Sequence, residues 1–357
     1  MAATRAGEQE HERTSPRRHV TITDVARAAG VSKAAVSYAL NHRTGVSAET
    51  RAHILSTAEQ LGWTPSLRAR SISLSRSHAL GLVVSRPSGA MASPFLSQAI
   101  IGIQEVIQPR RLVLLQAMAA DEAEEIELYR TLAHDGRVDG FFLIDLHKDD
   151  QRMTALDELG LPFVAFGPSD EPDSELVVGS DTELALREAT QMLIDLGHTR
   201  FACVTGPARL THTPHRVEVI AQVLRDAGLP EPVVELGDYS AASGAERTRR
   251  ILARSVRPTA LVFANDMMAI GGMGMARELG YRIPEDLSML GMEDIELAAH
   301  VTPGLTTIRT DGRAVGAEAA RRLVAWLDPS GAPEPGPIPR PVLMRRGSTG
   351  RATTHEG

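Results

Sequence analysis

The stretch HVTITDVARAAGVSKAAVSYALNHRTGVSAETRAHILSTAEQL, residues 19–61, predicts three short helices separated by tight breaks. The first helix begins after Thr21, because a threonine followed three residues later by Asp24 is typical of a capping box. Gly30 ends this helix, since glycine readily adopts the left-handed conformation that closes a helix. The stretch therefore predicts a small helical domain.

The second helix is expected over residues 33–41 after a cap at Ser32, and its side chains divide into two faces. Val36, Ala39 and Leu40 recur at helical spacing and are expected to face inward. The outward face then presents small or hydrogen-bonding residues, namely Lys33, Ala34, Ser37, Tyr38 and Asn41. Such a face fits the major groove of DNA, but a plain three-helix bundle has the same periodicity, which leaves both interpretations open.

The third helix is expected to begin after Ser47 and to end at Gly62. Its apolar residues are expected to close the small core, namely Ile54, Leu55, Ala58 and Leu61. The chain continues as WTPSLRARSI, residues 63–72, in which a proline precedes alternating arginine and small or apolar residues.

From residue 20 to residue 72 the chain resembles, without a gap, the LacI family of bacterial transcription regulators. The segments that carry the resemblance are VTITDVARAAGVSKAAVSYALN, VSAETR and WTPSLRARSI. The resemblance implies a helix-turn-helix headpiece in which Lys33, Ala34 and Tyr38 read bases. It also implies phosphate contacts by hydroxyl and amide residues, namely Thr21, Thr23, Ser32, Ser37, Asn41, Ser47 and Thr50.

Two residues depart from the family's headpiece pattern. Ala35 stands where the family has threonine, so a hydroxyl for a phosphate contact is missing. Tyr38 stands where the family has arginine, and tyrosine cannot form the two-pronged hydrogen bond that arginine makes to guanine O6 and N7. The base preference of the family therefore does not carry over at this position.

Residues 65–74 are expected to form either a hinge helix or a plain interdomain linker. The resemblance favours the hinge, which in the family forms on DNA and inserts an apolar side chain into the minor groove. Ile72 matches the inserting position, and Ala69 would share the brief helix with it.

The formal charge of the chain is −7, which is unusual for a DNA-binding protein, but the charges are unevenly distributed. Residues 1–76 carry 11 Lys and Arg against 6 Asp and Glu, whereas residues 77–357 carry 27 against 39. The basic part coincides with the helix-turn-helix. With 357 residues, 43% of them hydrophobic, the chain is long enough for a small head and a two-part body.

Several other kinds of site are not expected. Cys203 is the single cysteine and lies in an apolar run, which predicts a buried core thiol and excludes an intramolecular disulfide. His198, His212 and His215 are interpreted as surface histidines, so no metal site is expected, and no cofactor either. The sequence GMGMAR at 272–277 lacks the third glycine of a dinucleotide-binding loop and lies within an expected helix.

After residue 77, short apolar runs alternate with amphipathic segments, which predicts an α/β body. The expected strands are residues 80–84, 112–116, 140–144, 162–166, 201–205, 233–236, 260–264 and 287–290. The expected helices are residues 95–108, 121–133, 182–196, 214–227, 242–254, 265–279 and 313–327. Four such units, a crossover near residues 177–181 and a repeat of the pattern predict two parallel-sheet lobes, with a ligand cleft at the carboxyl ends of their strands.

The body also resembles the family, whose body is a type I periplasmic-binding-protein-like fold. The segments that carry this resemblance are SDTE at 180–183, LGH at 196–198, AND at 264–266, IPED at 283–286, GMED at 291–294 and PGLTT at 303–307. The resemblance implies an effector cleft lined by Ser93, Phe95, Asp181, Arg216, Tyr239, Asn265 and Glu293. Its carboxylates, arginine and amide suit a sugar-like polyol.

The alternative is that Asp181, Arg216 and Asn265 serve only as helix caps and salt bridges. The cleft also departs from the family pattern, because Glu293 replaces aspartate, Met292 replaces an aromatic residue and Val219 replaces a glycine. The identity of the effector therefore does not carry over.

The prolines between residues 329 and 341 predict an extended surface connection, and the segment VLMR at 342–345 resembles the family's last strand. The residues after this strand are too few for the heptad helix that makes some members tetrameric, so a homodimer is expected. The expected domains are a disordered tail at 1–18, the headpiece at 19–64, hinge and linker at 65–77, the two-lobed body at 78–349 and a tail at 350–357.

Together these features predict a repressor without enzymatic activity, which binds a pseudopalindromic DNA operator as a homodimer and responds to a small-molecule effector. The second hypothesis is a solute-binding protein or a two-lobed enzyme of sugar metabolism. The sequence shows no export signal, no apolar run of membrane-spanning length and no catalytic motif. These features favour the regulator and predict a cytoplasmic location.

Overall fold

The computed structural model describes residues 20–40, 44–63, 76–85, 93–167 and 176–353. The chain divides into two compact units, Met1–Ser75 and Arg76–Gly357. In the part of the chain that the structure describes, no helix is long and apolar enough to cross a membrane.

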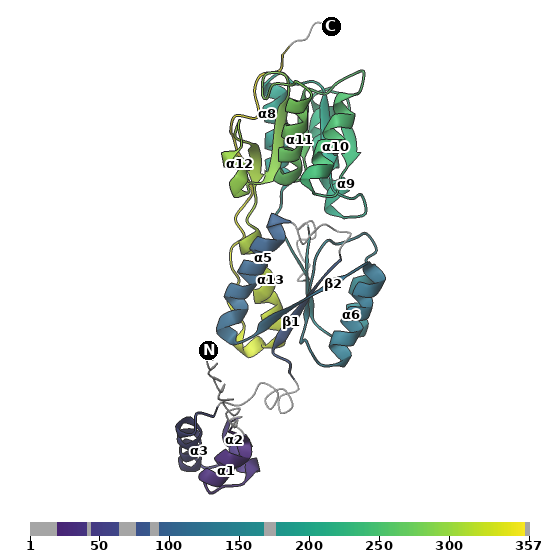
Figure 1. The fold of residues 1–357 in the computed structure, drawn as a ribbon. Helices are drawn as coiled ribbons and strands as arrows, with labels where there is room; N and C mark the ends of the chain where they lie inside the picture. Colours follow the sequence, from purple (N-terminus) through teal and green to yellow (C-terminus); the bar gives the residue numbers. More distant parts are fainter. Residues whose placement is uncertain (1–19, 41–43, 64–75, 86–92, 168–175, 354–357) are drawn as a thin grey trace, which may run out of the picture. The chain divides into compact units, whose positions relative to one another are not determined.

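The first unit contains the helices α1 (Ile22–Ala28), α2 (Lys33–Leu40) and α3 (Ala48–Gln60) (Figure 1). At the start of α1, Thr21 and Asp24 form the predicted capping box. The hydroxyls of Ser32 and Ser47 each accept a hydrogen bond from a backbone N–H three residues later, at 3.1 and 3.2 Å. The structure therefore confirms the three predicted helix starts.

The core of the first unit is formed by Val25, Val36, Ala39, Ile54 and Ala58 together with smaller neighbours. Two predicted core residues are wrong, because Leu55 is 42% and Leu61 is 37% exposed. The buried face of α3 consists of Ile54, Thr57 and Ala58, and Leu55 lies about 100° around the helix from Ile54.

The first lobe of the second unit is built on a parallel sheet with the strand order β2-β1-β3-β4-β5. Its strands are β1 (Ala79–Ser85), β2 (Val113–Ala119), β3 (Phe141–Leu143), β4 (Phe163–Phe166) and β5 (Val177–Val178). Alternate strand residues point to opposite faces. Leu82 and Phe142 pack against α5 (Pro94–Ile107) and α13 (Gly312–Leu327). Val83 and Phe141 pack against α6 (Glu122–His134) and α7 (Gln151–Glu158).

The second lobe has a sheet of order β11-β10-β9-β8-β6-β7, in which β11 alone runs antiparallel to its neighbour. Its strands are β6 (Phe201–Thr205), β7 (Val233–Leu236), β8 (Ala260–Phe263), β9 (Ser288–Glu293), β10 (Thr306–Arg309) and β11 (Val342–Met344). One face packs against α8 (Glu183–Asp195) and α9 (His212–Asp226). The other packs against α10 (Ala241–Leu252), α11 (Asp266–Glu278) and α12 (Glu296–His300).

The chain returns to the first lobe after β10, which corrects the expectation of a single crossover. Helix α13 lies beside α5 (Figure 1), and its residues Val315 and Leu323 belong to the core of the first lobe. A Cβ added at Gly102 would lie 1.9 Å from the Arg313 carbonyl oxygen, and one at Gly316 would lie 2.0 Å from that of Ala99. Glycine is therefore required at both positions for the two helices to approach this closely.

Three further expectations can be compared with the structure. All eight expected strands are present, whereas β5, β10, α7 and α12 were not predicted. Cys203 is buried as expected, and burial raises the pKa of its thiol to about 12. The interpretation of His198 as a surface residue is wrong, because it is 2% exposed and its ring nitrogens form hydrogen bonds with Thr259 and Ser288 at 2.9 Å.

Candidate functional site

The exposed face of α2 presents the residues that are predicted to read bases. Lys33, Ala34 and Tyr38 are exposed, and Ser37 is half-buried. The ring of Tyr38 lies against Gly45, where an added Cβ would be 3.3 Å from the ring, yet the residue remains 40% exposed. One side of the Tyr38 ring is therefore held against Gly45, and the rest of the side chain is accessible to a binding partner.

The carboxyl-terminal end of α2 is fixed by a side chain of α3. Arg51 Nη1 donates hydrogen bonds to the carbonyl oxygens of Tyr38 at 3.1 Å and Ala39 at 2.5 Å. A cation at this end satisfies carbonyl groups and interacts favourably with the helix dipole. The guanidinium group thus helps to hold α2 at a defined angle to α3.

The hydroxyl residues predicted to contact phosphates gather at helix starts. Thr21, Ser32 and Ser47 cap α1, α2 and α3, and Thr50 Oγ1 lies 2.8 Å from Ser47 Oγ. Thr23 lies half-buried in the first turn of α1. Helix N-termini attract anions, so this arrangement is suited to a phosphate backbone. Asn41, Ala69 and Ile72 lie outside the described residues.

In the second unit, a cavity of about 150 Å³ lies where strands of both sheets end. Its lining includes Ile144 after β3, Phe166 at the end of β4, Ala264 after β8 and Glu293 at the end of β9. The first turns of α5 and α9 complete the wall. The space has room for about five water molecules, which suits a small organic ligand.

The first-lobe side of the cavity is mostly apolar. Phe95 from α5 and Phe166 from β4 pack edge to face, with ring centroids 6.5 Å apart. Leu96 and Ile144 extend this wall. Aromatic rings placed in this way can pack against the apolar face of a flat or ring-shaped ligand.

The second-lobe side supplies charge through Arg216 on α9 and Glu293 on β9. Burial lowers the pKa of Arg216. Burial also raises the pKa of Glu293 to about 8, with a further increase from the carboxylate of Asp266 and an opposing effect from Arg216. Within the described part of the chain, Glu293 Oε2 is buried without a hydrogen-bond partner. An acceptor left in this state is ready to bind a ligand.

A neutral aromatic pair borders the same cavity. His212 Nε2 lies 2.6 Å from the Tyr239 hydroxyl, and the two rings are tilted at a centroid distance of 6.2 Å. Burial lowers the pKa of His212 to about 3, with help from Arg216, so the imidazole is neutral near pH 7. An added Cβ at Gly206 would lie 2.0 Å from the Tyr239 hydroxyl oxygen, so this ring position requires glycine there.

Three cavity-lining residues have left-handed backbones, with φ of 54° at Asp145, 69° at Tyr239 and 107° at Glu293. Residues other than glycine adopt this conformation at a cost of about 1–3 kcal/mol each, and they cluster at ligand sites. These three residues therefore give up some local stability, and in return their side chains are placed at the cavity.

The structure brings together five of the seven residues predicted for the effector cleft, because Ser93, Phe95, Arg216, Tyr239 and Glu293 all line the cavity. The other two are not among its lining residues, and each instead bonds the backbone at a helix start. Asp181 Oδ1 accepts a hydrogen bond from the backbone of Glu183 at 2.9 Å. Asn265 caps α11, and its Nδ2 donates to the carbonyl oxygen of Tyr239 at 3.0 Å, which supports the cavity wall indirectly.

Sequence reasoning missed several lining residues. Asp145 and Phe166 lie at the carboxyl ends of two predicted strands, where the cleft was expected. They could therefore have been predicted to line it. His212 and His215 were interpreted as surface residues, because their proximity to the cavity depends on how α9 is placed on its sheet. Nothing in their immediate sequence indicates that placement.

Comparisons with known proteins agree with this architecture. Residues 21–66 match the family described as bacterial regulatory proteins, lacI family, and residues 190–349 match the periplasmic binding protein-like domain. The HTH-type transcriptional regulator CelR of Thermobifida fusca is 32% identical over 315 residues, which are 86% of this chain and 92% of that protein. The ribose operon repressor of Escherichia coli K12 is 32% identical over 339 residues, covering 92% and 99%.

Solved structures show the same likeness. The lac repressor dimer bound to operator and an anti-inducer matches with a TM-score of 0.75 at 27% identity, covering 93% of this chain and all of that one. A complex of CelR with cellobiose matches with a TM-score of 0.68 at 30% identity, covering 92% and 100%.

The chain therefore belongs to the LacI family of bacterial regulators. It is a DNA-binding transcriptional regulator controlled by an effector, and its named relatives are regulators rather than enzymes.

Proposed function

We propose that this chain is a repressor whose effector is a sugar or a related polyol bound in the cavity between the two lobes. The observation that carries the proposal is that Arg216 and the unpartnered oxygen of Glu293 border a cavity with aromatic walls. Arginine donates to sugar oxygens, a carboxyl group accepts from hydroxyls, and the rings of Phe95 and Phe166 pack against apolar ring faces. CelR with bound cellobiose and the ribose operon repressor, both relatives, support a sugar.

The effector-binding residues in this proposal are Ser93, Phe95, Arg216, Tyr239 and Glu293, and Asp181 and Asn265 contribute by fixing the neighbouring helix starts. The ligand favours one arrangement of the lobes and the operator favours another, so their binding is coupled. No coenzyme takes part in this mechanism.

On DNA, we propose that α2 enters the major groove with Lys33, Ala34 and Tyr38 facing bases. The hydroxyl residues at helix starts contact phosphates, and Asn41, Ala69 and Ile72 are assigned by the family resemblance alone. Two copies of the chain bind the two halves of a pseudopalindromic operator. A repressor of chromosomal genes acts in the cytoplasm.

The effector is tested by titrating the full chain with cellobiose and with ribose in a calorimeter, and by repeating a gel shift on DNA upstream of its own gene at saturating sugar. One sugar is expected to bind and to change operator affinity. If neither sugar nor a wider panel of saccharides bound while operator binding remained normal, the effector would belong to another chemical class.

The DNA face is tested with Tyr38→Ala. The mutant is expected to lose about 1–3 kcal/mol of binding free energy for the preferred operator and to discriminate less at one or two positions. Binding to operator variants is measured at fixed salt, because phosphate contacts make affinity strongly salt-dependent. An equal loss for every sequence would make Tyr38 a phosphate contact instead.

A further inference from the structure

The two lobes touch each other at a second place, outside the effector cavity. His147, in the loop after β3, forms an isolated antiparallel bridge with Leu210, which precedes α9. Next to it, the backbone N–H of Thr211 donates to the carbonyl oxygen of Leu146 at 2.9 Å. Arg209 Nε donates to His147 Nε2 at 3.4 Å. Three contacts thus join one short loop of each lobe.

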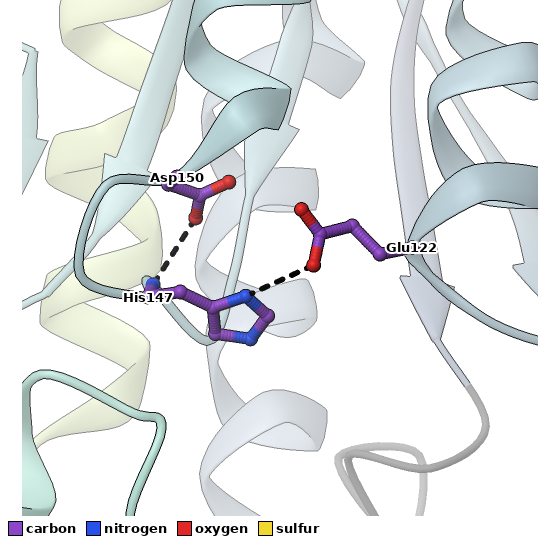
Figure 2. A group of neighbouring side chains, drawn as sticks. All are labelled: Glu122, His147 and Asp150. Atoms are coloured by element: carbon purple, nitrogen blue, oxygen red, sulfur yellow. Dashed lines mark hydrogen bonds and ion pairs between the residues drawn. The ribbon is translucent and has the colours of Figure 1, made fainter.

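Figure 2 shows the first-lobe side of this contact. The ring of His147 points toward Glu122, with Nδ1 3.5 Å from Glu122 Oε2, and its backbone N–H donates to Asp150 Oδ2 at 3.1 Å. Arg152 donates hydrogen bonds to both carboxylate oxygens of Asp150. Glu122, His147, Arg152 and Arg209 all border a polar cavity of about 200 Å³, which neighbours the effector cavity.

The same three side chains of Figure 2 bring one possible metal ligand each within 4.8 Å of one another, but a metal ion does not fit the bonding there. Asp150 already accepts two hydrogen bonds on each oxygen, from Arg152 and from backbone N–H groups. The guanidinium groups of Arg152 and Arg209 also border the site and would repel a cation.

The Arg209 contact favours one protonation state of His147. Arginine is always a donor, so His147 Nε2 has to be the acceptor, and the ring is neutral with its proton on Nδ1 beside Glu122. A second proton would remove that acceptor and place a cation against Arg209. Burial lowers the pKa of His147, Arg152 and Arg209 lower it further, and Asp150 and Glu122 oppose them.

We propose that His147 and Arg209 form a latch that holds the two lobes closed while His147 is neutral and weakens when it is protonated. Neither residue lines the effector cavity, so both are positioning residues for lobe closure. The latch does not require a bound effector. It can therefore be tested on the ligand-free chain, whatever the effector is.

The pH window follows from linkage. With the lobes open, His147 loses the Arg209 contact and part of its burial, so its pKa returns toward the ordinary value near 6.5. Closure is then fully favoured above that value and becomes weaker as pH falls below it. For each unit by which the pKa differs between the two states, the closed population relative to the open one falls by up to about tenfold.

The experiment measures the distance between spin labels on the two lobes of the full chain by pulsed electron paramagnetic resonance. Cys203 is buried, so labels attach selectively to Thr131→Cys on α6 and Ala242→Cys on α10, both exposed positions. At pH 7.5 a closed population is expected, and at pH 5.5 the population ratio is expected to shift about three- to tenfold toward longer distances.

Variants identify the groups responsible. His147→Gln keeps an acceptor near Nε2 but cannot gain a proton, so it is expected to retain the closed population at both pH values. Arg209→Gln is expected to lose most of it at pH 7.5. The matched control is Arg225→Gln, since Arg225 is also exposed but pairs within its own lobe with Glu218 and Glu231.

The proposal is overturned if the wild-type distances do not change between the two pH values. It is equally overturned if His147→Gln shows the same pH shift as the wild type, or if Arg209→Gln behaves like Arg225→Gln. A ligand-free readout also separates this proposal from the sugar assignment, because either can fail while the other holds.

Discussion

Each lobe contains an arginine shielded from solvent near the carboxyl ends of its strands, but their surroundings differ. Arg152 in the first lobe is 2% exposed and donates to Asp150 through Nε at 2.9 Å and Nη2 at 2.6 Å, to Glu125 at 3.1 Å and to the Asp145 carbonyl oxygen at 2.8 Å. Arg216 in the second lobe borders the effector cavity, and no carboxylate among the described residues forms an ion pair with it.

Arg152 and Asp150 stabilise each other's charge, whereas burial raises the pKa of Glu125 despite the opposing effect of Arg152. Hydrogen bonds from Arg152 lower the pKa of Asp150 although burial opposes this, and the two carboxylates raise the pKa of Arg152 against the effect of its burial. Burial lowers the pKa of Arg216 and raises that of Glu293, so each charge there is disfavoured. A satisfied cluster maintains the fold, whereas a cluster with disfavoured charges is suited to receive a ligand.

The largest expected effect is the loss of stability in Arg152→Met. The substitution leaves the carboxylates of Glu125 and Asp150 buried without their cation, and breaking a buried pair in this way costs about 3–5 kcal/mol. Urea unfolding followed by circular dichroism measures the change. Arg225→Met is the control, because this arginine is exposed and solvent screens its ion pairs, so its loss should change stability far less. Equal stability of the two variants would contradict a structural role for Arg152.

The second prediction concerns Arg216→Ala, which should affect binding rather than folding. Loss of charge-assisted hydrogen bonds worth about 1.5–3 kcal/mol lowers affinity for the bound sugar by roughly ten- to a hundredfold. The free energy of unfolding should change by less than about 1 kcal/mol, since no ion pair is broken within the described chain.

Calorimetric titration and urea unfolding of Arg216→Ala give the two numbers, and operator affinity without sugar should match the wild type. If the mutant unfolded, Arg216 would have a structural role like that of Arg152. A mutant that binds sugar normally would place the effector site elsewhere.

The sequence alone predicted many of the elements that position these two arginines. Continuous apolar runs predicted the strands, because a strand covered on both faces is apolar throughout. The ends of those strands predicted a cleft, and the family resemblance then assigned Phe95, Arg216 and Glu293 to it, all of which line the cavity. Capping residues such as Thr21 and Ser47 specified helix starts through local chemistry.

The features that the sequence did not predict depend on contacts between distant segments. The return of α13 to α5 rests on Gly102 and Gly316, and neither glycine signals its partner. Asp181 and Asn265 have the composition of a binding site, but whether a side chain caps a helix or faces a cavity depends on a backbone orientation that residue type does not specify. The contact of His147 with Arg209 likewise joins two loops of different lobes.

The smallest expected effect, and the one that sharpens the contrast most, is the pH dependence of stability in Glu293→Gln. The pKa of Glu293 is about 8 in the folded protein, against an ordinary value near 4.5. The folded state therefore holds a proton that the unfolded chain releases between these values, so the stability linked to this group is full below pH 4.5 and decreases as pH rises toward 8. Asp150, beside Arg152 in the first lobe, shows the opposite tendency, because its pKa is lowered.

Glutamine stays neutral at every pH and keeps the shape of the side chain, so Glu293→Gln should match the wild type near pH 5 and exceed it at pH 8.5. The full shift sets an upper limit of several kcal/mol, and a gain of at least about 1 kcal/mol is expected. Urea unfolding without ligand at both pH values measures it. At pH 8.5, where the wild-type group is largely ionised, sugar affinity should fall in the same variant, because a neutral amide accepts hydroxyl hydrogen bonds more weakly than a carboxylate does. A variant with the same stability gain at both pH values would show that packing, and not ionisation, limits the wild type at this position.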